Sequence, residues 1–376
     1  MALTAFGGPQ AHMAYFLDHF VDKRGYLNEK ELLELNALCQ ILPGPTSTQT
    51  ITAIGFRIGG PGLAYLTLLV WSLPAISILV FIAIALSSFQ HKEEILAHIK
   101  YIQPIAVGFI AYAAYRITTK VIESKSGILV MVLSIGLSLY AGSPFLYPVL
   151  ILIGGLVTAI KYKRQPIIEK NEPFKVNWTN FILWGSVVIV AGALATFTPV
   201  RPIKLFENFY RNGSLIFGGG QVLIPLLYTE FVKFKHFLTS AEFLSGFGLA
   251  QAVPGPVFSF SAYIGALSMR NDGVGGMILG AIMSAAGIFL PGTFLIFFVI
   301  RFWESLKRYR IVRASLEGIT AASSGMVVAA AIILFKPLEL NIINPLLVVL
   351  TFAILQFTKV KAPFIILGGI ILGFIL

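Results

Sequence analysis

The stretch Phe6-Gly7-Gly8-Pro9-Gln10 returns 211 residues later as Phe217-Gly218-Gly219-Gly220-Gln221. Pro43-Gly44-Pro45 returns at the same spacing as Pro254-Gly255-Pro256. No gap is needed between these two marks, and 14 of the 40 positions from Phe6 to Pro45 are identical in the second copy. A duplicated segment that glycine and proline interrupt, inside an apolar chain, is typical of a transport site built where two repeats meet.

The composition indicates an all-α polytopic membrane protein. Hydrophobic residues make up 57% of the chain and charged residues 12%, whereas a soluble domain carries about 25% charged residues. The mean hydropathy is +0.84. The apolar stretches reach the roughly 20 residues that a transmembrane helix needs, and they lack the alternation of outer-membrane strands. The segment 1–16 has neither the basic start nor the cleavage site of a signal peptide.

Charge and cysteine usage argue against several classes of function. The net charge of +11 comes from basic residues in short loops between apolar segments, as the positive-inside bias produces, so nucleic acid is not an expected partner. One cysteine and five scattered histidines offer no ligand set for a metal, and no cofactor is expected. A membrane-embedded enzyme would cluster Asp, His or Cys at the ends of spans. The sequence has no such cluster, so we do not expect an enzyme.

Each copy of the repeat is expected to form helices that break at the same two places. Proline lacks the N–H group and clashes with the preceding turn, so Pro43-Gly44-Pro45 must open a helix that runs from about 28 to 42. In the first copy a break at 7–9 precedes this helix; a shorter helix to about 58 and spans near 63–89, 101–120, 128–141 and 145–160 follow it. An additional span near 179–198 precedes the second copy, whose breaks are 218–220 and 254–256 and whose spans lie near 276–300, 312–335, 342–357 and 363–376.

Three regions follow from these segments: a first repeat at 1–160, a basic linker at 161–178, and a second repeat at 179–376 that includes the additional span. The five basic residues between 161 and 175 place the linker in the cytoplasm. The loop 301–313 is equally basic, whereas its counterpart 90–100 carries two lysines beside two glutamates. Equivalent loops on opposite faces predict inverted repeats whose Gly/Pro-broken helices are re-entrant.

The repeated breaks predict a binding site for a small anion. A helix that begins in mid-membrane presents free N–H groups and the positive end of its dipole, which together bind anions. Hydroxyl side chains follow both Pro-Gly-Pro motifs, and the amide of Gln49 follows the first; these groups can donate to the same ligand. The expected site residues are Gly7, Gly8, Gln10, Gln40, Pro43, Gly44, Pro45, Thr46, Ser47, Thr48, Gln49, Gly219, Gly220, Gln221, Gln251, Pro254, Gly255, Pro256, Ser259 and Ser261.

The alternative reading of the same motifs is structural. Proline and glycine are common in membrane helices, so both motifs could only kink a buried hairpin. The four repeated glutamines would then hold the opened backbone together, and the glycines would allow helices to pack closely.

Four further side chains are candidates for attracting the anion or for coupling its transport to protons. Arg57 can draw an anion to the cytoplasmic mouth, or it can anchor the helix at the interface. Glu31 and Glu242 are repeat partners that can carry a proton if buried; the alternative is a solvated polar face. His12 can titrate near neutral pH or serve a structural role.

At these motifs the chain resembles the chromate ion transporter family, in its long-chain, two-domain form. The resemblance covers both halves. The residues that carry it are Thr4-Ala5-Phe6-Gly7-Gly8-Pro9 with His12, Leu42-Pro43-Gly44-Pro45-Thr46-Ser47-Thr48-Gln49, Gly219-Gly220-Gln221-Val222-Leu223-Ile224-Pro225-Leu226-Leu227, and Gly248-Leu249-Ala250-Gln251-Ala252-Val253-Pro254-Gly255-Pro256. Members usually have more residues before the first glycine break, and Val257-Phe258 replaces part of the polar run that follows the first Pro-Gly-Pro.

The resemblance implies a multi-pass carrier in a bacterial-type inner membrane that exports chromate, driven by the proton gradient, and so confers chromate resistance. The residues themselves indicate a small oxyanion and leave sulfate, a dianion of similar shape, as an alternative substrate. An anion channel of the same architecture is the other alternative. The expected partners are the transported chromate or sulfate and membrane lipid, and the chain is compatible with a homodimer.

Overall fold

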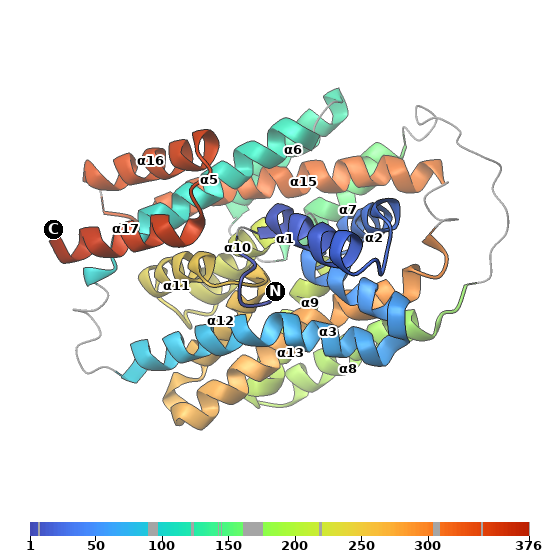
Figure 1. Cartoon of the computed structure of the whole chain (residues 1–376). Helices are drawn as coiled ribbons and strands as arrows, with labels where there is room; N and C mark the ends of the chain where they lie inside the picture. The colour runs from blue at the N-terminus through green and yellow to red at the C-terminus, as the bar shows by residue number, and fades with distance from the viewer. Residues whose placement is uncertain are drawn as a thin grey trace.

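The computed structural model describes residues 1–6, 8–88, 97–121, 124–141, 143, 145–160, 176–217, 220–303, 309–339 and 341–375. Within these ranges the chain is helical and contains no strand (Figure 1). The first part comprises α1 (Gly8–Phe16), the π-helix η1 (Leu17–Lys23), α2 (Glu29–Ile41), α3 (Thr46–Ser88), α5 (Ile102–Val121), α6 (Lys125–Ala141) and α7 (Leu146–Ala159).

The second part contains the remaining helices. They are α8 (Thr179–Phe197), α9 (Arg201–Leu215), α10 (Gly220–Leu227), the π-helix η3 (Tyr228–Phe234), α11 (Ser240–Ala252), the 3₁₀ turn η4 (Val257–Ser259), α12 (Phe260–Ser268), the 3₁₀ turn η5 (Arg270–Asp272), α13 (Gly273–Val299), α15 (Arg310–Phe335), α16 (Ile343–Phe357) and α17 (Ala362–Ile375).

Among the described residues, four helical segments are long and apolar enough to cross a membrane: α3, α8, α13 with η5, and α15. The additional span is the clearest case, because only 6% of the most apolar window of α8 is buried inside the protein. A helix that is apolar all round yet exposed has lipid as its natural surroundings. The chain is therefore a multi-pass integral membrane protein, as its composition predicts.

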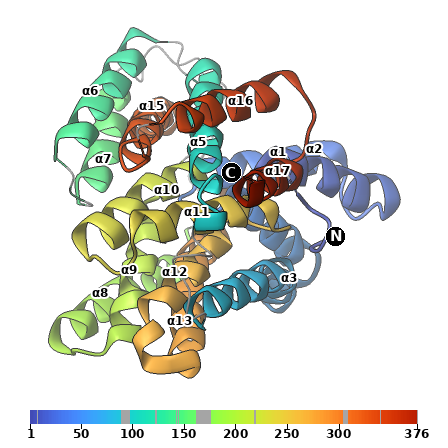
Figure 2. The ribbon, with the colours of Figure 1, turned by 90° about the vertical axis from the view of Figure 1, so that its left-hand side faces the viewer.

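The helices form two groups. In Figure 1, α3, α13 and α8 run through the lower part of the view, and α15 and α6 through the upper part. Figure 2, turned by 90°, shows α10 and α11 between these groups and α12 beside α3 and α13. The contacts agree, since α12 packs against both α3 and α13, whereas α10 packs against α15. The segments around the breaks thus lie inside the helical body.

Local structure recurs at the spacing of the sequence repeat. Asn28 caps α2 and Thr239 caps α11, each in a capping box with the glutamate three residues later, Glu31 or Glu242. Both helices have 13 residues and end just before a Pro-Gly-Pro break. A π-helix precedes each of them, η1 in the first copy and η3 in the second. The predicted helix at 28–42 and its interruption are confirmed.

The short helix predicted to end near 58 and the span predicted from 63 both lie in α3, which is interrupted between them. Gly59 and Gly60 depart from helical geometry, with Gly60 at φ 70° and ψ −164°. Gly273 has nearly the same conformation, φ 70° and ψ −173°, where η5 meets α13. The helix α9 is an element that the hydropathy pattern does not predict, because it is amphipathic rather than uniformly apolar. It packs against α13.

Candidate functional site

The two Pro-Gly-Pro breaks connect the halves of the chain through a reciprocal pair of backbone hydrogen bonds. The N–H of Gly44 donates to the carbonyl of Ile216 at 2.8 Å, and the N–H of Gly255 donates to the carbonyl of Ala5 at 3.0 Å. Donor and acceptor are each related to their counterparts by the same 211 residues. Such an exchange is what a two-fold relation between two repeats produces. We call these four residues the junction.

Glycine is required at both junction donors. Gly44 and Gly255 have φ values of 121° and 117°, which other residues rarely adopt. Space is also limiting: a Cβ atom on Gly44 would lie 2.8 Å from Nε2 of Gln49 and 3.5 Å from Cα of Gly292, in α13. A Cβ atom on Gly255 would lie 3.0 Å from Cβ of Ala75, in α3. Each break is therefore packed against the long helix of the other half.

Helices begin directly after both breaks, and the polar residues of their first turns are buried. Thr48 and Gln49 in α3 are 1% and 2% exposed, and Ser259 and Ser261 are fully buried. Nε2 of Gln49 donates to the Pro43 carbonyl at 2.7 Å, which closes the first break. The hydroxyls of Thr48, Ser259 and Ser261 have no hydrogen-bond partner within the protein.

Other described residues near these turns also carry buried polar atoms without a protein partner. A buried donor or acceptor without a partner costs about 1–3 kcal/mol, so such groups are rare in folded proteins. Three of these groups, the hydroxyls of Thr48, Ser259 and Ser261, follow the two breaks, so the helix starts are the candidate site for a polar ligand. The further atoms are Oε1 of Gln49, Nε1 of Trp71, Nε2 of Gln251 and Oγ of Ser284.

His12 lies at the junction. Its Nε2 is 3.3 Å from the Ala5 carbonyl, and its Nδ1 is 3.0 Å from Oγ of Ser47. A carbonyl can only accept, so Nε2 carries the proton and, in the neutral ring, Nδ1 accepts from the Ser47 hydroxyl. The ring is 1% exposed and contacts Trp71 edge-on at 4.9 Å between centroids. His12 thus ties the start of α3 to the carbonyl that Gly255 also uses.

The two glutamates of the repeat occupy different surroundings. Glu242 accepts from Nη1 of Arg270 at 2.6 Å and is 2% exposed, so the alternative of a solvated polar face does not hold for this residue. Its capping box and the ion pair draw it against the protein. Glu31 pairs with Arg57 in the same way, but both side chains are partly exposed, at 29% and 44%. Arg57 therefore has an ion-pair partner at the surface.

Of the remaining predicted site residues, some lie near the breaks, one does not, and some are not described by the structure. Gly8 and Gly220 begin α1 and α10, and a Cβ atom on Gly220 would lie 3.5 Å from the Val257 side chain, next to the second break. Gln40 is exposed on α2 and does not belong to the buried group. Gly7, Gly218, Gly219 and the side chains of Gln10 and Gln221 lie outside what the structure describes.

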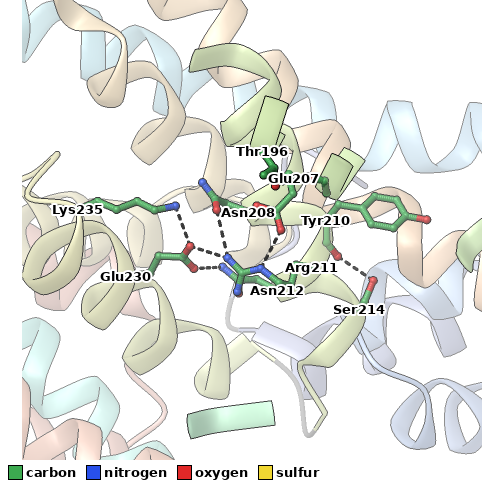
Figure 3. A network of polar contacts seen from close by, with 10 residues as sticks. Thr196, Glu207, Asn208, Tyr210, Arg211, Asn212, Ser214, Glu230 and Lys235 are labelled. Atoms are coloured by element: carbon green, nitrogen blue, oxygen red, sulfur yellow. Dashed lines mark hydrogen bonds and ion pairs between the residues drawn. The ribbon is translucent and has the colours of Figure 1, made fainter. Parts of the chain in front are cut away.

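A buried ionic cluster is the main feature that the sequence did not predict (Figure 3). Glu230 of η3 is 1% exposed, and its Oε1 accepts from Arg211 at 2.8 Å and from Lys235 at 2.9 Å. Oε2 accepts from Asn212 at 2.7 Å. Arg211 also donates to Glu207 at 2.9 Å. The cluster joins the end of α9 to η3. It therefore holds together the chain segments that precede and follow Ile216.

The sequence contains only a weak indication of this ionic cluster. Glu230 is an acidic residue inside an apolar run, which by default marks a functional or paired group. Its partners Arg211 and Asn212 lie on α9, and an amphipathic helix is not apparent from hydropathy alone.

Two cavities in the described structure lie away from the junction. One, of about 290 Å³, is apolar and lies between α8, α9 and α13, with Val190, Leu194 and Phe206 in its wall. The other, of about 720 Å³, lies along α2 and includes Leu33 and Ala37. Neither lining contains a junction residue, so the anion site expected at the breaks stays a prediction.

Comparison with known proteins gives the chain a family. The model of the family described as chromate transporter matches residues 1–159 and 203–374. An uncharacterized transporter of Methanocaldococcus jannaschii is 25% identical over the whole chain and 92% of its own length. The chromate transport protein of Cupriavidus metallidurans is 24% identical over the whole chain and 90% of its own length. A probable chromate transport protein of Synechococcus elongatus is 26% identical over 89% of the chain and 82% of its own length.

No solved structure is similar to this chain. The family match covers both halves and so includes the residues on both sides of the junction. The chain therefore belongs to the chromate transporter family.

Proposed function

We propose that the protein is a secondary active transporter that exports chromate, a small tetrahedral oxyanion, across the inner membrane and uses the proton gradient to do so. The family supports chromate as the substrate, because relatives that match nearly the whole chain are named chromate transport proteins. The observation that carries the proposal is the junction, where each Pro-Gly-Pro break bonds the other half of the chain, together with the hydroxyls after each break that are buried and without a protein partner.

The oxyanion is held by helix N-termini and neutral side chains. No basic residue occurs at 46–50 or at 257–261, the five positions after each Pro-Gly-Pro motif, whereas Thr48, Ser259 and Ser261 lie there. Neutral donors suit a carrier, because two fixed cations in a site of low dielectric constant would bind a dianion so strongly that its release would be slow. The backbone N–H groups at the start of α3 and of η4 complete the donor set.

The two repeats, 1–160 and 179–376, are inverted in the membrane, with the linker 161–178 in the cytoplasm. The reciprocal bonds of the junction support a two-fold relation, and the charge contrast of the loops supports an axis in the membrane plane. Much of the loop 90–100 and all of 161–175 lie outside the described residues. In this arrangement each break rests on the other half, so rocking one half against the other alternates access to the site.

Admission of the anion and proton coupling involve the charged residues near the site. Arg57 raises the local concentration of anions at the cytoplasmic mouth, although Glu31 offsets part of its charge. His12 and Glu242 are buried ionisable groups, and their hydrogen-bond partners connect them to α3 and to η5.

Transport into everted membrane vesicles tests this function. With the cytoplasmic face outward, export appears as uptake of labelled chromate. We expect this uptake to proceed against the chromate concentration gradient. It should stop when an ionophore dissipates the proton gradient. Thr52→Ala serves as a matched control for site variants, because the Thr52 hydroxyl is satisfied by the Thr48 carbonyl at 2.8 Å.

Three results would contradict parts of the proposal. Flux that only follows the chromate gradient would make the protein a channel. Concentrative uptake of labelled sulfate in preference to chromate would make sulfate the substrate. Uptake that is unaffected by the ionophore would exclude proton coupling.

A further inference from the structure

Trp71 of α3 carries a buried donor that the proposed site does not yet use. Its side chain is 1% exposed, and its indole N–H has no acceptor within the protein. An indole nitrogen can only donate, so no rearrangement of protons satisfies it. Trp184 gives the contrast, since its indole N–H donates to Oγ of Ser214 at 3.0 Å. The unpaired N–H of Trp71 therefore points to an acceptor that is not part of the protein.

Several contacts place Trp71 at the junction. Its ring meets His12 edge-on, with centroids 4.9 Å apart, and packs at 5.5 Å from the ring of Phe16. His12 in turn bonds Ser47, the neighbour of Thr48. On the other side, a Cβ atom on Gly255 would lie 3.7 Å from the Trp71 carbonyl. Trp71 thus lies between the start of α3 and the second Pro-Gly-Pro break.

The second half has a counterpart. Gly60 and Gly273 share the same unusual backbone conformation, with φ 70° in both. When the long helices are aligned on these two glycines, Trp71 falls opposite Ser284. Ser284 is fully buried, and its hydroxyl also has no partner within the protein. It packs against Gly265 of α12, one turn after Ser261. The same position in both long helices therefore holds an unsatisfied donor.

We propose that the indole N–H of Trp71 and the hydroxyl of Ser284 bind the transported oxyanion, as a second pair of donors beside Thr48 and Ser259. This inference rests on the proposed oxyanion site. His12 acts as a positioning residue, because its ring contact and its bond to Ser47 fix the orientation of the indole. Trp71 also contributes to specificity, because its N–H donates a stronger hydrogen bond to an unprotonated, charged oxygen than to an oxygen that carries a proton.

Equilibrium dialysis of labelled chromate against the purified full chain tests the proposal. Trp71→Phe removes the N–H and keeps an aromatic ring against His12 and Phe16, and Ser284→Ala removes only the hydroxyl. We expect each variant to bind chromate roughly one to two orders of magnitude more weakly, the loss of one charge-assisted hydrogen bond. The matched controls are Trp184→Phe and Ser268→Ala, whose groups are satisfied by Ser214 and by the Ile264 carbonyl. Both controls should bind within about twofold of the parent protein, since neither touches the ligand.

Competition by phosphate separates a binding role from a structural one. At neutral pH phosphate carries a proton on at least one oxygen, so the parent protein should prefer chromate, and Trp71→Phe should lose part of that preference. If Trp71 had only a structural role, Trp71→Phe would weaken the binding of chromate and of phosphate to the same extent.

The outcomes distinguish this inference from the proposed function. If Thr48→Ala and Ser259→Ala weaken binding while Trp71→Phe and Ser284→Ala do not, the second pair of donors is wrong and the oxyanion site stands. If all four variants bind chromate like the parent, both proposals fail. If Trp71→Phe does not fold, Ser284→Ala decides, and unchanged chromate binding by that variant would overturn the inference.

Discussion

The carbonyl of Ala5 accepts a hydrogen bond from the backbone N–H of Gly255 at 3.0 Å, and the same carbonyl lies 3.3 Å from Nε2 of His12. One backbone oxygen of the first half therefore receives donors from both halves. The equivalent oxygen, that of Ile216, receives the N–H of Gly44. The residue equivalent to His12 is Leu223, which is fully buried and cannot donate. The two sides of the junction are therefore chemically unequal.

The hydroxyls after the breaks should contribute directly to affinity. Thr48→Ala and Ser259→Ala should each raise the half-saturating chromate concentration by roughly one to two orders of magnitude, because each hydrogen bond to a charged ligand is worth about 1.5–3 kcal/mol. Initial rates in everted vesicles measure this. Thr52→Ala should leave the value unchanged. Normal half-saturation in both site variants would leave the helix starts without a role in binding.

Arg57 should influence the rate of capture rather than the strength of binding. Arg57→Gln is expected to slow uptake at low ionic strength and to weaken its dependence on salt, since long-range attraction is what salt screens. Uptake rates between low and physiological salt concentration, compared with chromate affinity by dialysis, measure the two effects separately. A cationic binding site would instead appear as lost affinity in Arg57→Gln with normal binding by the hydroxyl variants.

The junction glycines should be sensitive to the smallest substitution. Gly44→Ala and Gly255→Ala should each lower stability by about 1–3 kcal/mol, because φ values of 121° and 117° are strained for alanine. The thermal unfolding midpoint in detergent measures the loss. Gly136→Ala in α6, where an added Cβ atom meets no neighbour within 4 Å, should be neutral or slightly stabilising. Equal midpoints for all three variants would show that the breaks tolerate side chains.

The repeat offers a matched pair of ion pairs at different depths. Glu242→Gln should destabilise the protein by about 1.5–3 kcal/mol, because it removes a buried charge from its hydrogen bond with Arg270, which is itself 30% exposed. Glu31→Gln should cost about 1 kcal/mol or less, since that pair is partly exposed. Glutamine preserves both capping boxes, so the comparison isolates charge. The prediction is wrong if thermal midpoints fall equally in the two variants.

Topology can be tested at two described positions. In a Cys39→Ser background, Lys100→Cys and Arg301→Cys should react with a membrane-impermeant maleimide from opposite sides of the membrane. The reason is the charge contrast between the equivalent loops 90–100 and 301–313. Labelling of both cysteines from one side, in intact cells and in everted vesicles, would exclude inverted repeats.

The fold was largely predictable because the lengths of its apolar helices and the Gly/Pro breaks between them can be recognised in the sequence. The helix at 28–42 begins at an Asn-x-x-Glu capping box and ends at a Pro-Gly-Pro motif, and both signals are local. The amphipathic helix α9 was not predictable in the same way, because hydropathy averages its two faces. The expected positions of the spans agree with the helices to within a few residues.

For the candidate site, only the residues close to the motifs in sequence could be predicted. The polar residues after each break were visible, but their burial without partners depends on the other half of the chain. Trp71 and Ser284 lie far from any motif in sequence, and only the crossing of α3 with α12 and of α12 with α13 brings them near the breaks. Glu230 takes two of its partners, Arg211 and Asn212, from α9, which hydropathy does not predict. Non-local packing decided each of these cases.

The reciprocity of the junction has a consequence for how the chain is made. Gly44 leaves the ribosome well before Ile216, so its N–H group has no native acceptor while the first repeat inserts into the membrane. At a synthesis rate of about 5–20 residues per second, this interval lasts roughly 10–40 s. An unpaired backbone group in lipid is costly, so a first repeat that inserts without the second should be less stable than the whole chain. Expressed alone, that repeat should be a target for membrane proteases, and co-expression of the second repeat should protect it.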